Sequence, residues 1–201
     1  MARLTLEQPL RGLILDTKLD DSYRRLPGSL IVDSLEEYDD GLLEEYPFVI
    51  VRPQPAEFDI EILDAFLLER YHQLQRVCLV IDELYSVAPG NTPSPGLTAL
   101  LTRGRTRGLT ILSGVQRPAW ISQFCFSEAD YFAVFRLQLD RDRERLADFG
   151  APEMLDNPLD KYFFWWYKVG EDRAVLHPPL TPLPALAPLP KVFEPEKMRM
   201  I

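Results

Sequence analysis

The chain has 201 residues, of which 46% are hydrophobic and 26% are charged, a composition typical of a globular protein with one sizeable core. No apolar run approaches the roughly 20 residues of a membrane span, and the N-terminal segment lacks the apolar core of a signal peptide, so we expect a cytoplasmic protein. The net charge of −9 arises within Asp33 to Asp64, where eleven acids face one base, and it disfavours passive wrapping of nucleic acid.

Short apolar runs alternate with helical stretches along the chain. The predicted strands are residues 12–16, 30–32, 48–51, 77–81, 109–112 and 131–135. The predicted helices are residues 59–75, 97–106 and 139–149. Because the strand runs are continuously apolar, they suit strands that are buried on both faces, as in parallel sheets. This order predicts an α/β fold with an open, mostly parallel sheet flanked by helices.

The C-terminal part has a different composition. Residues 162–168 are rich in aromatic side chains and predict a last strand, in which the rings serve the core or strand pairing. Seven prolines between Pro178 and Pro195 exclude helix and central strand there and favour an extended tail. We therefore expect a core over residues 1–170 and a proline-rich tail over residues 171–201. Cys78 and Cys125 each lie in an apolar stretch, where buried, reduced thiols are expected.

Two carboxylates follow the most apolar predicted strand. The segment Val-Cys-Leu-Val-Ile is followed directly by Asp82 and Glu83, where the strand leaves the sheet. Ligands bind at this edge in open α/β sheets. Hydrolysis of a nucleoside triphosphate needs one carboxylate to hold Mg²⁺, a role that suits Asp82, and a second group to orient the attacking water, a role that suits Glu83. The alternative is an ordinary strand that ends in two solvated acids.

A second motif follows about twenty residues later. Its sequence is Gly-Arg-Thr-Arg-Gly-Leu-Thr-Ile-Leu-Ser-Gly-Val-Gln-Arg-Pro, from Gly104 to Pro118. It predicts a helix that ends in arginines, then a strand with Gln116 at its carboxyl end, where an amide can sense a γ-phosphate or position water. The arginines could reach a phosphate in an adjacent subunit. Alternatively, they balance the dipole of the helix C-terminus.

These two motifs together resemble the HerA/FtsK branch of P-loop ATPases, RecA-like motors that translocate DNA. The short chain is most similar to the DNA-packaging ATPases of tailless, membrane-containing icosahedral viruses. The resemblance also covers Arg11 to Lys18, which is similar to the strand after the P-loop helix, and extends to about residue 169. It implies that Asp82 binds Mg²⁺, that Glu83 is the catalytic base and that Gln116 is the sensor. The resemblance also implies an arginine finger, for which Arg105 is the first candidate and Arg103 and Arg107 are the alternatives.

The chain departs from this family at the phosphate-binding loop. A P-loop has the pattern G-x-x-x-x-G-K-[ST], and the sequence contains no Gly-Lys dipeptide. The chain thus resembles the family domain without its first β-P-loop-α unit, as a fragment, a late start or a degenerate relative. Loss of a strand would leave an apolar, aggregation-prone edge unless another chain fills it.

The resemblance implies an ATP-driven motor that uses Mg²⁺ and ATP and acts on double-stranded DNA. It further implies a homo-oligomer, a hexamer in this family, that is cytoplasmic or virion-associated and meets a viral vertex or membrane complex. Whether this chain hydrolyses ATP stays open without a P-loop. The alternative is a non-catalytic assembly or scaffold protein with a degenerate RecA-like fold. A phage assembly ATPase of the Zot type is a third interpretation.

Overall fold

A computed structural model describes residues 11–90, 92–155 and 160–181 of the chain. The chain divides into two compact units. The first comprises the described residues of 1–87 and 94–115, and the second comprises those of 88–93 and 116–182. The first unit contains the parallel sheet with both predicted carboxylates, so it is the unit that positions most of the candidate site.

The first unit is built on a five-stranded sheet with the order β2-β3-β1-β4-β5. The strands are β1 (Arg11–Leu15), β2 (Ser29–Val32), β3 (Phe48–Val51), β4 (Val77–Ile81) and β5 (Thr110–Ser113). Every neighbouring pair in this sheet is parallel. All residues of β2, β3 and β4 are buried, as their continuous apolar runs predicted. The predicted α/β fold with a mostly parallel sheet is therefore confirmed.

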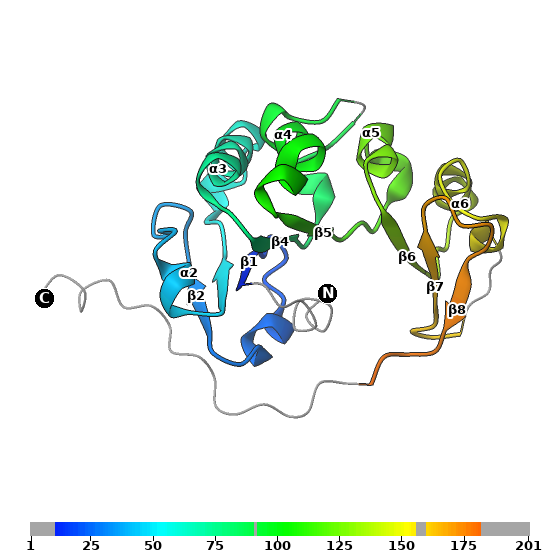
Figure 1. The fold of residues 1–201 in the computed structure, drawn as a ribbon, viewed down its shortest axis with the longest axis horizontal. Helices are drawn as coiled ribbons and strands as arrows, with labels where there is room; N and C mark the ends of the chain where they lie inside the picture. The colour runs from blue at the N-terminus through cyan, green and yellow to red at the C-terminus, as the bar shows by residue number, and fades with distance from the viewer. Residues whose placement is uncertain (1–10, 91, 156–159, 182–201) are drawn as a thin grey trace, which may run out of the picture. The chain divides into compact units, whose positions relative to one another are not determined.

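Two helices cover one face of this sheet. Figure 1 shows α3 (Ile60–Gln73) and α4 (Pro95–Arg103) side by side above the strands. The first begins at the side chain of Asp59, which accepts hydrogen bonds from the two backbone N–H groups of Glu61 and Ile62. The second begins with Pro95, a residue suited to the first helical turn. The short helix α2 (Leu42–Glu45) precedes β3.

Short 3-10 helices complete the connections in both units. They are η1 (Asp21–Arg25), η2 (Pro55–Glu57), η3 (Leu84–Ser86), η4 (Gly104–Arg107), η5 (Pro118–Trp120) and η6 (Pro152–Leu155). The fourth of these continues α4 and ends at Gly108, whose φ of 69° is the left-handed conformation that glycine adopts without strain. The chain then turns directly into β5.

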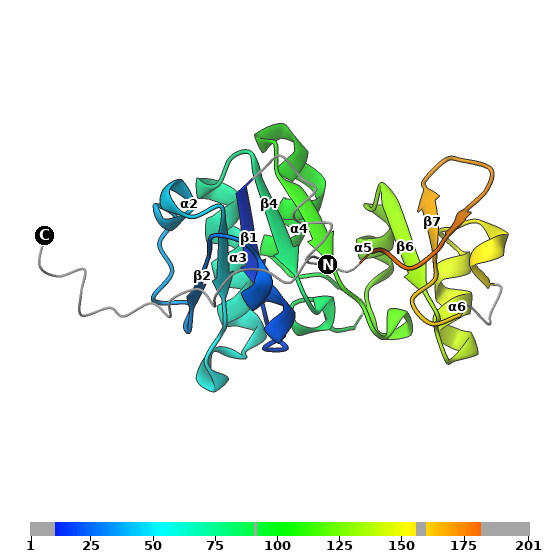
Figure 2. The same cartoon turned by 90° about the horizontal axis from the view of Figure 1, so that it is seen from below.

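The opposite face of the sheet carries a row of side chains in register across all five strands. The row consists of Ile31, Ile50, Ile14, Val80 and Leu112. Tyr23 and Leu26, which follow β1, belong to the same apolar cluster and are almost fully buried. Figure 2, seen from this face, shows β1 and β4 side by side. Only the last member of the row, on β5, is partly exposed, so the cluster is least covered at that edge.

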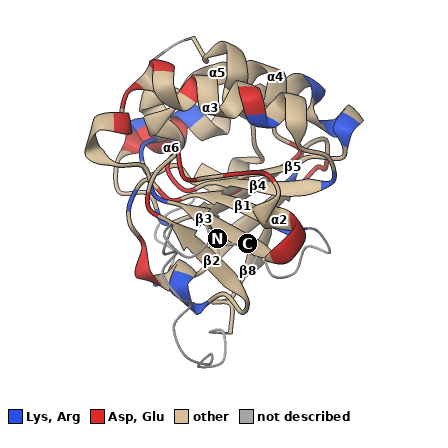
Figure 3. Cartoon of the chain, turned by 90° about the vertical axis from the view of Figure 1, so that its left-hand side faces the viewer, with Lys and Arg blue, Asp and Glu red and all other residues tan. Residues whose placement is uncertain are grey.

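Charged residues lie around the sheet rather than in it. Strands β3 and β4 contain no charged residue, and Figure 3 shows the charges mainly on helices and loops. Asp16, Arg52 and Asp82 are charged residues that are buried directly after strands. Burial of an ion is costly unless it is paired, so these three residues mark a buried polar site at the carboxyl edge.

The second unit contains a separate antiparallel sheet, β6 (Tyr131–Phe135), β7 (Phe164–Lys168) and β8 (Val175–His177). Helices α5 (Gln123–Ser127) and α6 (Asp140–Ala147) belong to the same unit. The sequence predicted β6 as part of one open sheet, but its burial alternates along the strand, so only one face is covered. β8 lies inside the segment predicted as a tail, and its residues gave no periodic signal. Residues 182–201 lie outside the described residues.

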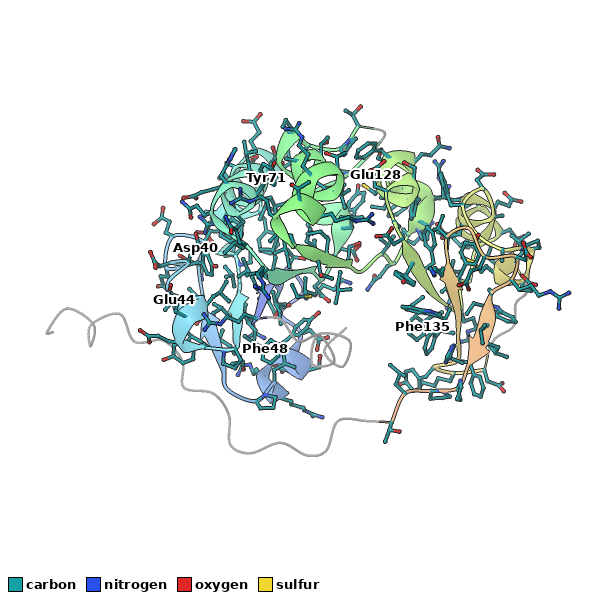
Figure 4. The ribbon with its side chains drawn as sticks, viewed as in Figure 1. Asp40, Glu44, Phe48, Tyr71, Glu128 and Phe135 are labelled. Atoms are coloured by element: carbon teal, nitrogen blue, oxygen red, sulfur yellow. The ribbon has the colours of Figure 1, made fainter. Side chains whose placement is uncertain are left out.

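Aromatic rings pair across the antiparallel sheet. The ring of Tyr131 stacks on Trp166 with centroids 5.3 Å apart, and Phe135 contacts Phe164 at 5.1 Å. Figure 4 labels Phe135 on β6. Cross-strand aromatic pairs stabilise antiparallel sheets. The prediction that these rings serve strand pairing is confirmed.

Candidate active site

Asp82 and Glu83 lie at the carboxyl edge of the sheet, directly after β4. The backbone N–H of Asp82 donates to the carbonyl of Leu15, which extends the β1–β4 pairing by one residue. Asp82 is buried, whereas Glu83 is half-buried and its side chain accepts a hydrogen bond from the N–H of Tyr85. The two carboxylates therefore differ in environment, as two different roles would require.

One oxygen of Asp82 is fixed by a hydrogen bond and the other is not. The hydroxyl of Tyr23 donates to Oδ1 at 2.8 Å, in a buried contact. Burial, with the nearby charge of Asp82, raises the pKa of Tyr23 far above its usual value, so the phenol remains a donor. Oδ2 of Asp82 is buried and has no hydrogen-bond partner among the described residues. A buried acceptor without a partner is rare, and it is suited to a metal-bound water.

The connection after β1 is held by a buried ion pair. Nε of Arg52 lies 2.9 Å from Oδ2 of Asp16, and both side chains are almost fully buried. The N–H of Asp20 donates to the other oxygen of Asp16 at 2.9 Å. Desolvation raises the pKa of Asp16, while this N–H and the Arg52 charge oppose that shift. The ion pair fixes the turn that delivers Lys18 and Tyr23 to the two carboxylates.

Lys18 contacts both residues of the carboxylate pair. Its Nζ lies 3.0 Å from Oε2 of Glu83 and donates to the backbone carbonyl of Asp82 at 3.2 Å. The hydroxyl of Ser86 also lies 3.3 Å from that of Thr17, which joins the same two connections. The turns after β1 and β4 therefore form one polar cluster.

Gly114 brings the end of β5 against the same turn. Its N–H donates to the carbonyl of Ile81, and its carbonyl accepts from the N–H of Leu84. A Cβ at this position would lie 2.3 Å from the carbonyl oxygen of Asp82, closer than any real side chain approaches. Only glycine permits this backbone contact.

Gln116 is an exposed residue that follows β5 and begins the second unit. The next residue, Arg117, donates from Nε to Oδ2 of the buried Asp142 at 2.9 Å. The other oxygen of Asp142 accepts from the N–H of Ala119, and the Arg117 guanidinium lies 4.2 Å from the Trp120 ring centroid. The segment after Gln116 is thus anchored within its own unit.

The three candidate arginines lie at the opposite, amino-terminal edge of the sheet. Arg103 ends α4, and Arg105 and Arg107 lie in η4, before β5 begins. The strand of four residues separates them from the carboxyl edge by about 13 Å at ~3.3 Å per residue. The guanidinium of Arg107 donates to the carbonyls of His72 and Leu74, at the end of α3. Arg103 and Arg105 are exposed.

The described residues offer no ready-made metal cage. No group of three or more His, Cys, Asp or Glu side chains there is arranged to hold a metal ion. A single carboxylate oxygen without a partner fits Mg²⁺ that is held through water and by the substrate's phosphates.

A groove of about 520 Å³ lies elsewhere in the first unit, lined by residues that include Arg11, Asp40, Glu44 and Arg76. Arg11 begins β1 and Arg76 precedes β4, so the groove is at the amino-terminal edge, away from Asp82 and Glu83. Figure 4 labels Asp40 and Glu44 near α2. The charges of the groove are mixed, and we assign it no ligand.

Sequence reasoning missed the side chains that surround the carboxylates. They are Asp16, Lys18, Tyr23, Arg52 and Gly114. One signal was visible, since Arg52 is the only base between Asp33 and Asp64. A single base in an acidic segment indicates an ion pair, although the sequence does not show which acid is its partner.

Comparison with known proteins identifies relatives of the chain. No family model matches it. It is 29% identical over 182 residues to the DNA packaging ATPase P9 of Enterobacteria phage PRD1, a match that covers 86% of this chain and 74% of that protein. The chain is homologous to a viral DNA-packaging ATPase. The resemblance predicted from the two motifs is therefore confirmed.

Solved structures show the same fold. The genome packaging NTPase B204 of Sulfolobus turreted icosahedral virus 2, in complex with ATP-gammaS, superimposes with a TM-score of 0.70 and 18% identity, covering 90% of this chain and 88% of that one. The DNA-packaging ATPase B204 of Sulfolobus turreted icosahedral virus gives a TM-score of 0.66 at 19% identity, with the same coverage. Among the residues that the structure describes, no helix is long and apolar enough to cross a membrane.

Proposed function

We propose that this chain is part of an ATP-driven motor that packages viral DNA. The observation that carries the proposal is the carboxylate pair after β4, in which one buried oxygen of Asp82 accepts no hydrogen bond from the described residues. The homology to a phage packaging ATPase supports the same function. The non-catalytic scaffold protein is less favoured, because the relative found by sequence is a packaging ATPase.

Each residue has a role that its position supports. Asp82 holds the water shell of Mg²⁺ through Oδ2, and Glu83 accepts the proton of the attacking water as general base. Gln116, which follows β5, would be the sensor of the γ-phosphate, as the family resemblance implies. Bound Mg²⁺ would neutralise charge that develops on the phosphate oxygens during transfer.

The arginines act in trans in this proposal. They lie at the amino-terminal edge and the carboxylates at the carboxyl edge, so an arginine of one copy reaches the nucleotide of the next. Arg105 remains our first choice, with Arg103 and Arg107 as the alternatives, as the family resemblance implies; all three lie at the amino-terminal edge. A head-to-tail contact forms a ring when its rotation closes, and we propose a hexamer around double-stranded DNA, the assembly that the family resemblance implies.

The free edge of β5 is where we place the missing phosphate-binding element. Among the described residues β5 pairs only with β4, and Ile111 and Leu112 are half-buried where the corresponding residues of β4 are fully buried. We propose that a strand, a P-loop and a helix, from this polypeptide or another chain, complete the sheet there. Its viral relatives lead us to propose that the protein works in the cytoplasm or on the virion, at a vertex or membrane complex.

The coding DNA upstream of Met1 gives the first test. We expect an in-frame G-x-x-x-x-G-K-[ST] pattern followed by a helical stretch. A stop codon close upstream, without that pattern, would favour the non-catalytic scaffold, or a protein whose phosphate-binding element comes from another chain.

Calorimetry with Mg-ATP tests the same proposal on the protein. The chain alone should bind Mg-ATP with a Kd well above the micromolar range. The reason is that it lacks the P-loop lysine and backbone N–H groups that hold the phosphates. In a motor that includes the phosphate-binding element, Glu83→Gln should abolish ATP hydrolysis and DNA packaging, while Mg-ATP still binds. Packaging that survives Glu83→Gln would favour the scaffold.

A further inference from the structure

We infer that Lys18 positions the proposed catalytic base, Glu83, by holding its carboxylate against the turn after β4. Its Nζ lies 3.0 Å from Oε2 of Glu83, 3.2 Å from the carbonyl oxygen of Asp82 and 4.0 Å from Oδ2 of Asp82. One ammonium group therefore touches both residues of the pair. The inference rests on the proposed function for the roles of the two acids.

The environment makes this pair more than a surface contact. The side chains of Lys18, Glu83 and Asp82 are only 33%, 15% and 9% exposed. Exposed ion pairs contribute little because water screens them, whereas partly buried pairs are screened less. Lys18 is also the only lysine among the described residues of the first unit. The ion pair is therefore a specific feature of this edge.

The backbone places Lys18 there independently of Glu83. The buried pair of Asp16 with Arg52 anchors the residue that ends β1, and the N–H of Asp20 closes the turn onto Asp16. Leu19 has a φ of 55°, a conformation that non-glycine residues adopt rarely. The turn around Lys18 is fixed from both sides, which lowers the entropic cost of holding the ammonium in place.

The contact between Lys18 and Glu83 suits the state of the motor before nucleotide binds. The ammonium, 3.0 Å from Oε2, restrains the rotation of the Glu83 carboxylate and competes with water for that oxygen. The same positive charge, 4.0 Å from Oδ2 of Asp82, opposes a divalent cation at that oxygen. Lys18 thus orders the base and weakens cation binding until phosphate oxygens compete for the ammonium. It acts through Glu83 and is a positioning residue.

A double-mutant cycle on the full chain tests the coupling. The variants are Lys18→Met, Glu83→Gln and the double variant, and the measurement is the Tm. We expect the decrease in Tm of the double variant to be about 2–4 °C smaller than the sum of the decreases of the two single variants. This is the difference that a coupled pair should show in a domain of this size. The control is the exposed ion pair of Lys168 with Glu171, at 3.7 Å, studied with the variants Lys168→Met, Glu171→Gln and their double variant. Its non-additivity should be less than half as large.

Manganese binding, followed by the electron paramagnetic resonance of free Mn²⁺, gives a readout that a merely structural lysine would not change. Lys18→Met should bind Mn²⁺ at least about threefold more tightly than the wild type, since a positive charge is lost near Oδ2. Lys18→Arg should restore both the wild-type affinity and the coupling to Glu83.

The outcomes separate this inference from the proposed function. Additive Tm losses would overturn the role of Lys18, and so would an unchanged Mn²⁺ affinity in a chain that binds Mn²⁺ through Asp82. If no variant binds Mn²⁺, or if Asp82→Asn binds it equally well, the proposed metal role of Asp82 fails instead. The inference is then decided by the Tm cycle and by rescue with Lys18→Arg.

Discussion

At the scale of single residues, the hydroxyl of Tyr23 is the group that distinguishes the two oxygens of Asp82. It donates to Oδ1, whereas Oδ2 accepts no hydrogen bond from the described residues. The tyrosine ring belongs to the apolar cluster under the sheet, so one side chain serves both the core and the site. Removal of the hydroxyl alone separates these two contributions.

We expect Tyr23→Phe to lower the free energy of unfolding by about 1–3 kcal/mol, because a buried carboxylate loses its donor while the ring still packs. Urea denaturation measures this change. Tyr162→Phe is the matched control, since Tyr162 is 64% exposed, and it should change stability by less than about 0.5 kcal/mol. Equal effects of the two variants would mean that the Asp82 contact is energetically unimportant.

The two cysteines are buried, free thiols, which confirms the expectation from the sequence. Burial raises the pKa of both Cys78 and Cys125 to about 11. Because the thiolate is the reactive form, neither should react with a thiol reagent at pH 8 in the folded chain, and both should react in urea. Rapid labelling at pH 8 without urea would contradict this.

The same shifts give a direction to the dependence of stability on alkaline pH. The folded pKa values lie above the ordinary thiol value of 9.0, so the unfolded chain loses these protons first. The contribution of both thiols to stability should therefore decrease as pH rises from about 9 to about 11. With both cysteines replaced by alanine, the denaturant concentration at the midpoint of unfolding should change less over that pH interval than it does in the wild type.

At the scale of elements, the end of β5 and the turn after β4 are joined through backbone contact. Gly114 exchanges hydrogen bonds with Ile81 and Leu84, and its Cα lies against the carbonyl of Asp82. This contact links the strand that leads to Gln116 with the two carboxylates. It explains why the second motif has glycine before the glutamine.

Gly114→Ala should lower the free energy of unfolding by about 1–3 kcal/mol, because the added Cβ must displace backbone rather than a side chain. Gly104→Ala is the matched control. Its Cβ would meet the nearest atom at an ordinary 3.4 Å, and its φ is helical, so we expect no loss of stability. Chemical denaturation of both variants decides the point, and equal stabilities would exclude the close contact.

At the scale of the whole molecule, the feature with the largest consequence is the edge of β5 that pairs with no strand among the described residues. A strand edge with half-buried apolar side chains is a template for another chain. The homology to a DNA packaging ATPase and the lack of a Gly-Lys dipeptide both lead to the proposal that a phosphate-binding element pairs there.

We expect the chain alone to associate in a concentration-dependent way, as measured by sedimentation velocity. Ile111→Lys should weaken that association at least severalfold, because a charge on an edge strand opposes pairing. Ile62→Lys, at a position 44% exposed on α3, should leave it unchanged. A chain that stays monomeric at all concentrations would show that this edge needs no partner.

Elements could be predicted from the sequence where their signal depends only on neighbouring residues. Strands β1 to β4 and helix α3 were predictable, because apolar runs and helical spacing are properties of neighbouring residues. The strand β6 was also predicted, but its partner was not, since pairing with β7 depends on a distant segment. β8 was not predicted, because three residues are too short for a periodic pattern.

The sequence by itself determined the α/β class, the position of Asp82 and Glu83 at a strand end, and the motif leading to Gln116. The tertiary structure alone decided that Lys18 and Tyr23, 64 and 59 residues before Asp82, contact that edge. It also separated the arginines from the carboxylates of the same chain. The physical reason is parallel register: β1 pairs with β4 so that Leu15 lies opposite Ile81, and the residues that follow each strand meet. No local pattern encodes which strands become neighbours.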